Sequence, residues 1–286
     1  MTPTAPARSR TAGLSGPALS ASRAKEYERC PLQYRLHVVD RIQEPPTRAT
    51  ALGTLVHSVL EHLFDLPHRE RTAEAALDLL EADWRATREK SPEVLDLFED
   101  ASEEGAWLAS ARNVVSAYFA IEDPQWLAPA ARERLVDAVT PDGIRLRGFI
   151  DRIDASPSGE LRVVDYKTGR APSPRFQDEA LFQMRFYALL LRLTDRMPAR
   201  TQLLYLKAGR VLTFDPTPAD IDRFAEEVSM LWGRIEADAM RGEFAPRRNP
   251  LCDWCGVRAM CPLFEGTLPD MPEDGLARLL ATRVSA

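Results

Sequence analysis

The sequence predicts an α/β protein in which a sheet is flanked by helices. Apolar residues recur at helical spacing up to about residue 122, and alternating β-branched runs separated by turn residues begin near residue 134. A long amphipathic pattern at about 218–241 follows the last of these runs. The order of helices, three strands, one helix, two strands and a final helix therefore indicates one sheet with helices on its faces.

The N-terminal part is expected to be mostly helical. Residues 1–19 are rich in small residues and proline, and they are predicted to form a disordered tail. Ser20 or Ser22 can N-cap a helix that continues to about Val38. Further helices are expected at about 52–66, 71–90, 92–100 and 105–122. Residues 65–125 are thus interpreted as a helical insert.

The strands are expected in the second half of the chain. Three strand-like runs lie at 134–139, 144–153 and 161–167, with turn sequences between them. A helix at about 177–193 follows, and a second hairpin comprises 201–206 and 211–214. We therefore expect a sheet of five strands.

Composition and charge narrow the function classes. No apolar run approaches the roughly 18 residues that a membrane span needs, and the N-terminus lacks the apolar stretch of a secretory signal. We therefore expect a cytoplasmic protein that does not bind a membrane. The net charge is −6, but residues 132–210 carry 15 basic and 10 acidic side chains. A locally basic half is compatible with phosphate binding, as is a solvated arginine face.

Two acidic residues and a lysine lie on neighbouring predicted strands. A hairpin of this length brings Asp151 and Asp165 together, and Asp165 and Lys167 point to the same face of their strand. Two carboxylates and an ammonium group at a sheet edge suit metal-assisted phosphodiester hydrolysis. A surface ion pair between Lys167 and Asp165 is the alternative interpretation.

Two helices supply further polar side chains. His57 lies four residues before Glu61, so both share one helix face, and a neutral imidazole can bind a divalent metal. Gln183 and Tyr187 share a face of a later, otherwise apolar helix, where they could order Lys167 or hold a phosphate. The alternatives are a core histidine, a solvent-facing glutamate, and a structural hydrogen bond between helix and sheet.

Four short motifs in order resemble a known family. They are Gly53…His57, Gly148…Asp151, Asp165-Tyr166-Lys167 and Gln183…Tyr187. In this order they resemble the motifs of the RecB-like branch of the PD-(D/E)xK nuclease superfamily. The resemblance spans about Ser20 to Leu263, so a nuclease domain is expected at 20–265 and a C-terminal extension at 266–286. It implies a restriction-endonuclease-like mixed sheet core flanked by helices. Ile150 stands where the superfamily name PD-(D/E)xK has a proline before the aspartate, as is usual in this branch.

The resemblance also implies roles for these residues. His57, Asp151 and Asp165 would bind Mg²⁺ or Mn²⁺, with the backbone carbonyl of Tyr166 as a further ligand. Lys167 would position or activate the attacking water, or stabilise the pentavalent phosphorus. Gln183 and Tyr187 would support the site and the DNA strand.

The cysteines form a second group. The chain holds only Cys30, Cys252, Cys255 and Cys261, and four thiolates suit either an iron–sulfur cluster or a structural zinc ion. One N-terminal cysteine with a C-terminal trio resembles the iron–sulfur nucleases of this branch. These include the nuclease domain of AddAB-type helicase–nucleases and the CRISPR-associated RecB-like exonucleases. The resemblance implies a [4Fe–4S] cluster that clamps the two ends of the domain together, with zinc as the alternative.

These observations predict a Mg²⁺- or Mn²⁺-dependent exonuclease that acts on single-stranded DNA in repair or recombination. The chain contains no G-x-x-x-x-G-K-[ST] sequence, so any unwinding would need a separate helicase. One alternative is a metal-dependent RNase or phosphoesterase. The other is a non-catalytic, cluster-stabilised module that binds DNA or serves as an adaptor.

Overall fold

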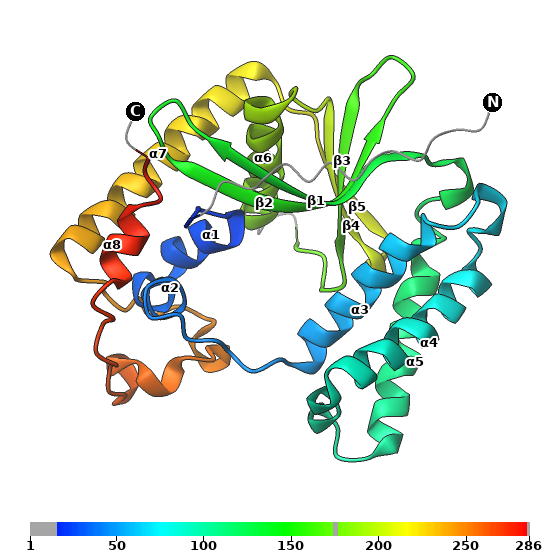
Figure 1. Ribbon diagram of the computed structural model, residues 1–286, viewed down its shortest axis with the longest axis horizontal. Helices are drawn as coiled ribbons and strands as arrows, with labels where there is room; N and C mark the ends of the chain where they lie inside the picture. The colour runs from blue at the N-terminus through cyan, green and yellow to red at the C-terminus, as the bar shows by residue number, and fades with distance from the viewer. Residues whose placement is uncertain (1–15, 174–176, 285–286) are drawn as a thin grey trace.

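A computed structural model describes residues 16–173 and 177–284, and it contains a mixed five-stranded sheet between two groups of helices (Figure 1). The strands are β1 (Pro129–Val139), β2 (Arg145–Ala155), β3 (Leu161–Lys167), β4 (Arg200–Tyr205) and β5 (Arg210–Phe214). They lie side by side in chain order, and all pairs are antiparallel except β3–β4. Helix α6 (Asp178–Thr194) connects that parallel pair, as a parallel crossover requires. The predicted α/β architecture and mixed sheet are confirmed.

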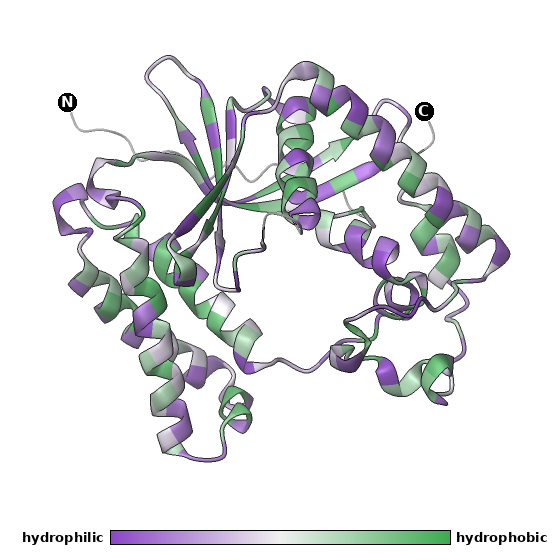
Figure 2. Cartoon of the chain, turned by 180° about the vertical axis from the view of Figure 1, so that it is seen from behind, coloured by the Kyte–Doolittle hydropathy of each residue, from purple (hydrophilic) through white to green (hydrophobic). Residues whose placement is uncertain are grey.

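Two hydrophobic cores cover the sheet. The first lies under α6 and α7 (Pro218–Arg241) and contains Trp232, Phe186 and Phe224, all buried. The second joins Val164, Tyr166 and Leu204 of the sheet to helices of the N-terminal half. These helices are α3 (Arg48–Leu63), α4 (Ala73–Lys90) and α5 (Ala101–Tyr118). The helices of the predicted insert, α4 and α5, pack against α3 and against each other in this second core. Hydrophobic and hydrophilic residues alternate along them (Figure 2).

The helix predicted from Ser20 to Val38 is wrong in one respect, because it is two helices. These are α1 (Ala21–Arg29), N-capped by Ser20, and α2 (Pro31–Val38). Cys30 separates them in an extended conformation, φ −158° and ψ 105°. Pro31 lacks an N–H group and forces the preceding residue out of the helical region. The break therefore leaves Cys30 at a corner between the two helices.

Several other boundaries differ from the sequence prediction: α3 and α5 each begin and end three or four residues earlier than expected, and β1 begins at Pro129 rather than at 134. The helix expected at 92–100 is a short 3₁₀ helix, Pro92–Leu97, which ends where Phe98 becomes extended. Part of the predicted tail joins the fold, because Leu19 is buried and pairs with Leu146 of β2. Residues 1–15 of that tail lie outside the described residues.

Shorter elements complete the described chain. The remaining 3₁₀ helices are His68–Glu70, Pro124–Trp126, Leu206–Ala208, Cys252–Trp254, Arg258–Met260 and Pro262–Phe264, and α8 spans Gly275–Leu280. Among the described helices, none combines the length and the apolar character needed to cross a membrane.

In the β1–β2 hairpin, the regular alternation of side chains between the two faces of the sheet is interrupted near the middle of each strand. Ile150 and Ile153 both join the core under α6, although residues three apart in a regular strand face opposite sides. On β1, Ala131 and Val136 contact the same core across an odd spacing. Between them Glu133 adopts a left-handed backbone conformation, φ 41°, which costs of order 1–3 kcal/mol for a residue with a side chain. This face change presents polar side chains at the middle of the hairpin.

A buried arginine ties the second core to the sheet. The Arg152 side chain is fully buried and donates to the hydroxyl groups of Tyr166 and Tyr118 at 2.7 and 3.2 Å. It also pairs with Glu122 at 2.7 Å and with Asp154 at 3.1 Å. Since Tyr166 lies between the two predicted site residues of β3, this network holds the strand that carries the site.

Replacing this arginine should destabilise the fold. Arg152→Ala empties a fully buried position and removes the donor to the Tyr118 and Tyr166 hydroxyls. Glu122 keeps Arg162 as a partner, so we expect the cavity and the lost hydrogen bonds to lower the free energy of unfolding by about 2–5 kcal/mol. Urea denaturation followed by circular dichroism measures the change. The matched control is Arg200→Ala, which removes an exposed pair with Asp215 and should leave the unfolding midpoint nearly unchanged. An unchanged midpoint for Arg152→Ala would contradict the structural role.

Candidate active site and metal centre

The two predicted aspartates lie next to each other on adjacent strands. Arg152 of β2 pairs with Val164 of β3, which places Asp151 beside Asp165 across the antiparallel ladder. Both side chains are buried. The backbone N–H of Tyr166 donates to Asp151 Oδ2 at 2.7 Å, so the carboxylate is attached to the strand that carries its partner.

His57 reaches this corner from α3. Thr47 caps the helix, and Gly53 faces the end of β3, where a Cβ atom would make ordinary contact with Thr168 Oγ1 at 3.6 Å. His57 Nε2 donates to the carbonyl oxygen of Tyr166 at 2.9 Å, and its Nδ1 lies 3.4 Å from Asp151 Oδ2. A metal-binding histidine characteristically donates its other ring N–H to such a carbonyl, which fixes the tautomer. The geometry therefore leaves Nδ1 facing the carboxylates.

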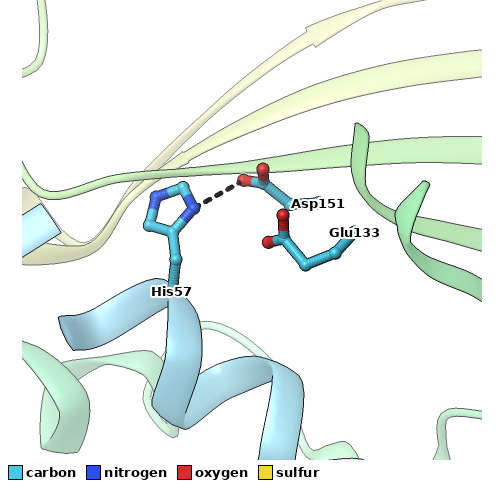
Figure 3. A group of neighbouring side chains, drawn as sticks. All are labelled: His57, Glu133 and Asp151. Carbon is cyan, nitrogen blue, oxygen red and sulfur yellow. Dashed lines mark ion pairs between the residues drawn. The ribbon is translucent and has the colours of Figure 1, made fainter. Parts of the chain in front are cut away.

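A glutamate that the sequence analysis missed completes this group. His57, Glu133 and Asp151 each present a ligand atom, and these atoms all lie within 4.8 Å of one another. Figure 3 shows the Glu133 carboxylate beside Asp151, with the imidazole of His57 facing the pair. A nitrogen and carboxylate oxygens are suitable ligands for Mg²⁺ or Mn²⁺. Glu61, one helical turn after His57, is not a member of this group.

Asp165 is held by three side chains. Gln183 Nε2 donates to Asp165 Oδ1 at 2.8 Å, and the Tyr187 hydroxyl donates to the same oxygen at 3.0 Å. Lys167 Nζ lies 2.7 Å from Asp165 Oδ2. The predicted active-site residues thus lie at one corner of the sheet, although Asp165 is not a member of the group formed by His57, Glu133 and Asp151. Gln183 and Tyr187 order Asp165 rather than contacting Lys167.

Crowding of the carboxylates shifts their proton affinities. Burial and the neighbouring Asp151 charge raise the pKa of Asp165, against the opposing effect of Lys167. Burial and the Asp151 charge also raise the pKa of Glu133 to about 7. For His57, burial opposes protonation, but the hydrogen bond and charge of Asp151 outweigh it and raise the pKa to about 9. The carboxylates around His57 therefore favour the binding of a proton or a metal cation.

The four cysteines gather at a second place. All four line one cavity of about 170 Å³ between α1–α2 and the C-terminal segment. The backbone N–H groups of Arg247 and Asn249 donate to Cys30 Sγ at 3.4 Å and to Cys252 Sγ at 3.3 Å. Cys255 and Cys261 pack against a small core formed by Leu32, Leu36 and Val257. The structure therefore places Cys30 beside the C-terminal trio of cysteines.

The fold and the site define a class of enzyme: hydrolases that bind divalent metal ions through acidic side chains on a mixed sheet and carry a lysine beside them. The family model described as the PD-(D/E)XK nuclease superfamily matches residues 18–262. The chain therefore belongs to the PD-(D/E)XK nuclease superfamily. It is a nuclease, and nucleases of this superfamily use divalent metals.

Individual relatives extend over nearly the same region. The Gene 69 protein of Mycobacterium phage L5 is 27% identical over 290 residues, covering 87% of this chain and 97% of its own. The Gene 69 protein of Mycobacterium phage D29 is 27% identical over 275 residues, covering 87% and 98%. A solved structure from Eubacterium rectale, named "Putative exonuclease", aligns with a TM-score of 0.52 and 16% identity, over 83% of this chain and 86% of that one. This last similarity supports the fold.

The stability of the protein without divalent metal should fall as the pH rises. The pKa of His57 is raised to about 9 in the folded protein, so its protonation stabilises the fold fully below its ordinary pKa of about 6.5. That stabilisation is lost as the pH rises to about 9. Glu133 acts in the same direction at lower pH, because its raised pKa makes stability fall between about pH 4.5 and about pH 7, so His57 dominates the interval from pH 7 to pH 9. We expect the unfolding temperature measured in chelator to decrease from pH 6.5 to pH 9.

A histidine variant tests whether His57 causes this decrease of the unfolding temperature with pH. His57→Asn should flatten it, and His62→Asn, on the same helix but outside the site, is the matched control. An unfolding temperature of the unsubstituted protein that stays constant or rises across this interval would contradict the assignment.

Proposed function

We propose that this nuclease is a Mg²⁺- or Mn²⁺-dependent deoxyribonuclease of the RecB-like branch, acting as an exonuclease on single-stranded DNA. The observation that carries the proposal is the convergence of His57, Asp151, Asp165 and Lys167 at one corner of the sheet. We assign it to DNA repair or recombination in the cytoplasm. A separate helicase would supply unwinding, since the chain has no P-loop sequence.

The site residues suit phosphodiester hydrolysis. A divalent ion, when bound, supplies a Lewis acid for the phosphate and makes its bound water more acidic. Asp151, Asp165 and His57 would hold that ion. The Tyr166 carbonyl accepts from His57, and its second lone pair remains available for the predicted metal contact. Lys167, kept beside the site by Asp165, would orient the attacking water or stabilise charge developing on the phosphate oxygens.

An exposed aromatic ring supports single-stranded DNA as the substrate. Phe149 is 58% exposed and lies two residues before Asp151 on β2. Unpaired bases stack on exposed aromatic side chains, whereas bases in a duplex are already stacked. This ring would lie close to the scissile phosphate.

The two alternatives predict different behaviour. A metal-dependent RNase or phosphoesterase would share the same metal corner but prefer RNA or small esters. A non-catalytic DNA-binding or adaptor module would not need Asp165 to be held by Gln183, Tyr187 and Lys167 at once. That ordered set favours the catalytic proposal.

We also propose that the four cysteines bind a [4Fe–4S] cluster. All four cysteines line one cavity, which places the N-terminal cysteine beside the C-terminal trio. The N–H groups that donate to Cys30 and Cys252 are typical partners of cluster thiolates.

Removal of the lysine should abolish cleavage. We expect Lys167→Ala to lower the rate by at least about 100-fold, because the developing charge loses its cationic partner. Folding and DNA binding should stay nearly unchanged. The assay compares labelled single-stranded DNA, duplex DNA and RNA in Mg²⁺ and in Mn²⁺, with oligonucleotides blocked at the 5′ or the 3′ end.

Lys207→Ala is the matched control for this assay, because it removes an exposed lysine just beyond β4. An active Lys167→Ala protein would refute the assignment of the site. Preferential cleavage of RNA would favour the RNase alternative, and cleavage of a substrate blocked at both ends would contradict exonuclease action.

Purification without oxygen should give a brown protein. If the cluster is present, the spectrum has a band at about 400 nm, and Cys255→Ser loses both the band and solubility. Asp253→Asn, an exposed change in the same loop, is the control and should keep the colour. A colourless protein with one zinc ion would contradict the cluster and leave the nuclease proposal intact.

A further inference from the structure

Glu133 occupies a special position on the hairpin. Its neighbours Arg132 and Arg134 pair with Arg152 and Ile150, so Glu133 stands directly opposite Asp151. Its backbone is left-handed, φ 41°, in the middle of a strand. Side-chain-bearing residues adopt this conformation rarely, and mostly where the surroundings or a function require it. Here it coincides with the face change that directs the carboxylate toward Asp151 and His57 (Figure 3).

In the metal-free protein the charge of Glu133 is offset in part by protonated His57. The carboxylate is partly buried beside the Asp151 carboxylate. Throughout the part of the chain that the structure describes, no lysine or arginine forms an ion pair with it, whereas Asp165 has Lys167. Two carboxylates facing each other in a poorly solvated corner repel, unless a cation lies between them.

The histidine is arranged to join them. His57 Nε2 is engaged with the Tyr166 carbonyl, which leaves Nδ1 as the nitrogen facing Asp151 and Glu133. One nitrogen and two carboxylates from three separate elements thus point into one small space. A pair of acidic residues without the histidine would not specify a metal in this way.

We propose that Glu133 is a direct ligand of the divalent ion, together with His57 Nδ1 and Asp151. The inference rests on the proposed nuclease function and deepens it, because it adds a ligand from β1 to the set taken from β2, β3 and α3. The left-handed backbone of Glu133 is then a metal-binding feature of the fold.

Binding of Mn²⁺ to the full chain, freed of divalent ions, tests the proposal by calorimetry or by the electron paramagnetic resonance of free Mn²⁺. Glu133→Gln should weaken binding at least about tenfold, because a ligand is lost. Glu160→Gln, the same change in the exposed β2–β3 turn, is the matched control and should bind as tightly as the unsubstituted protein.

Unfolding temperature without metal separates a ligand from a structural side chain. Because Glu133→Gln removes like-charge repulsion, the metal-free variant should be at least as stable as the unsubstituted protein, and added Mn²⁺ should raise its unfolding temperature much less. Glu133→Gly is the second variant: glycine tolerates the positive φ, so the fold is kept while the carboxylate is lost.

Each outcome decides the matter. Equal Mn²⁺ affinity in Glu133→Gln and in the unsubstituted protein would overturn the inference, as would a metal-free variant that is clearly less stable. Absence of Mn²⁺ binding by the unsubstituted protein would overturn both the inference and the proposed metal site. Tight, Glu133-dependent binding without DNA cleavage would support the inference and refute the proposed function instead.

Discussion

Repulsion among three carboxylates in one poorly solvated corner is the constraint on which the rest of the site depends. Asp151, Asp165 and Glu133 lie on three neighbouring strands, and each raises the cost of ionising another. The protein offsets this repulsion unequally. Asp165 receives Lys167 and two hydrogen bonds, whereas Asp151 and Glu133 face a histidine. Asp151 and Glu133, which lack such partners, therefore form the part of the site suited to a metal ion, whereas Asp165 holds the lysine.

The surrounding structure keeps these charges in place. Arg152 is buried behind the site and holds the Tyr166 ring, while the two backbone groups of Tyr166 bind Asp151 and His57. One residue of β3 therefore connects the arginine network, an aspartate and the histidine. Away from the active site, the four cysteines line a cavity between the α1–α2 pair and the C-terminal segment. Figure 1 shows α2 beside this segment. A site assembled from distant segments needs such fixed points.

Much of the fold could be predicted from the sequence, because its elements carry strong local signals. The amphipathic pattern at 218–241 coincides with α7, which has a capping threonine before it and a glycine after it. The strand 161–167 has the bounds of β3. The break at Cys30 was missed, although Pro31 signals it, because the helical periodicity continues on both sides of the proline.

The sequence by itself determined the α/β class, the candidate site residues on α3, β2, β3 and α6, and the four cysteines, because these depend on residue type and short spacing. Only the tertiary structure decided that Glu133 joins them. Its position follows from cross-strand register and a left-handed backbone at a face change. No local pattern encodes these features, since a regular alternation gives no indication of where a strand changes face. The tautomer of His57 is decided in the same way, by a carbonyl 109 residues away.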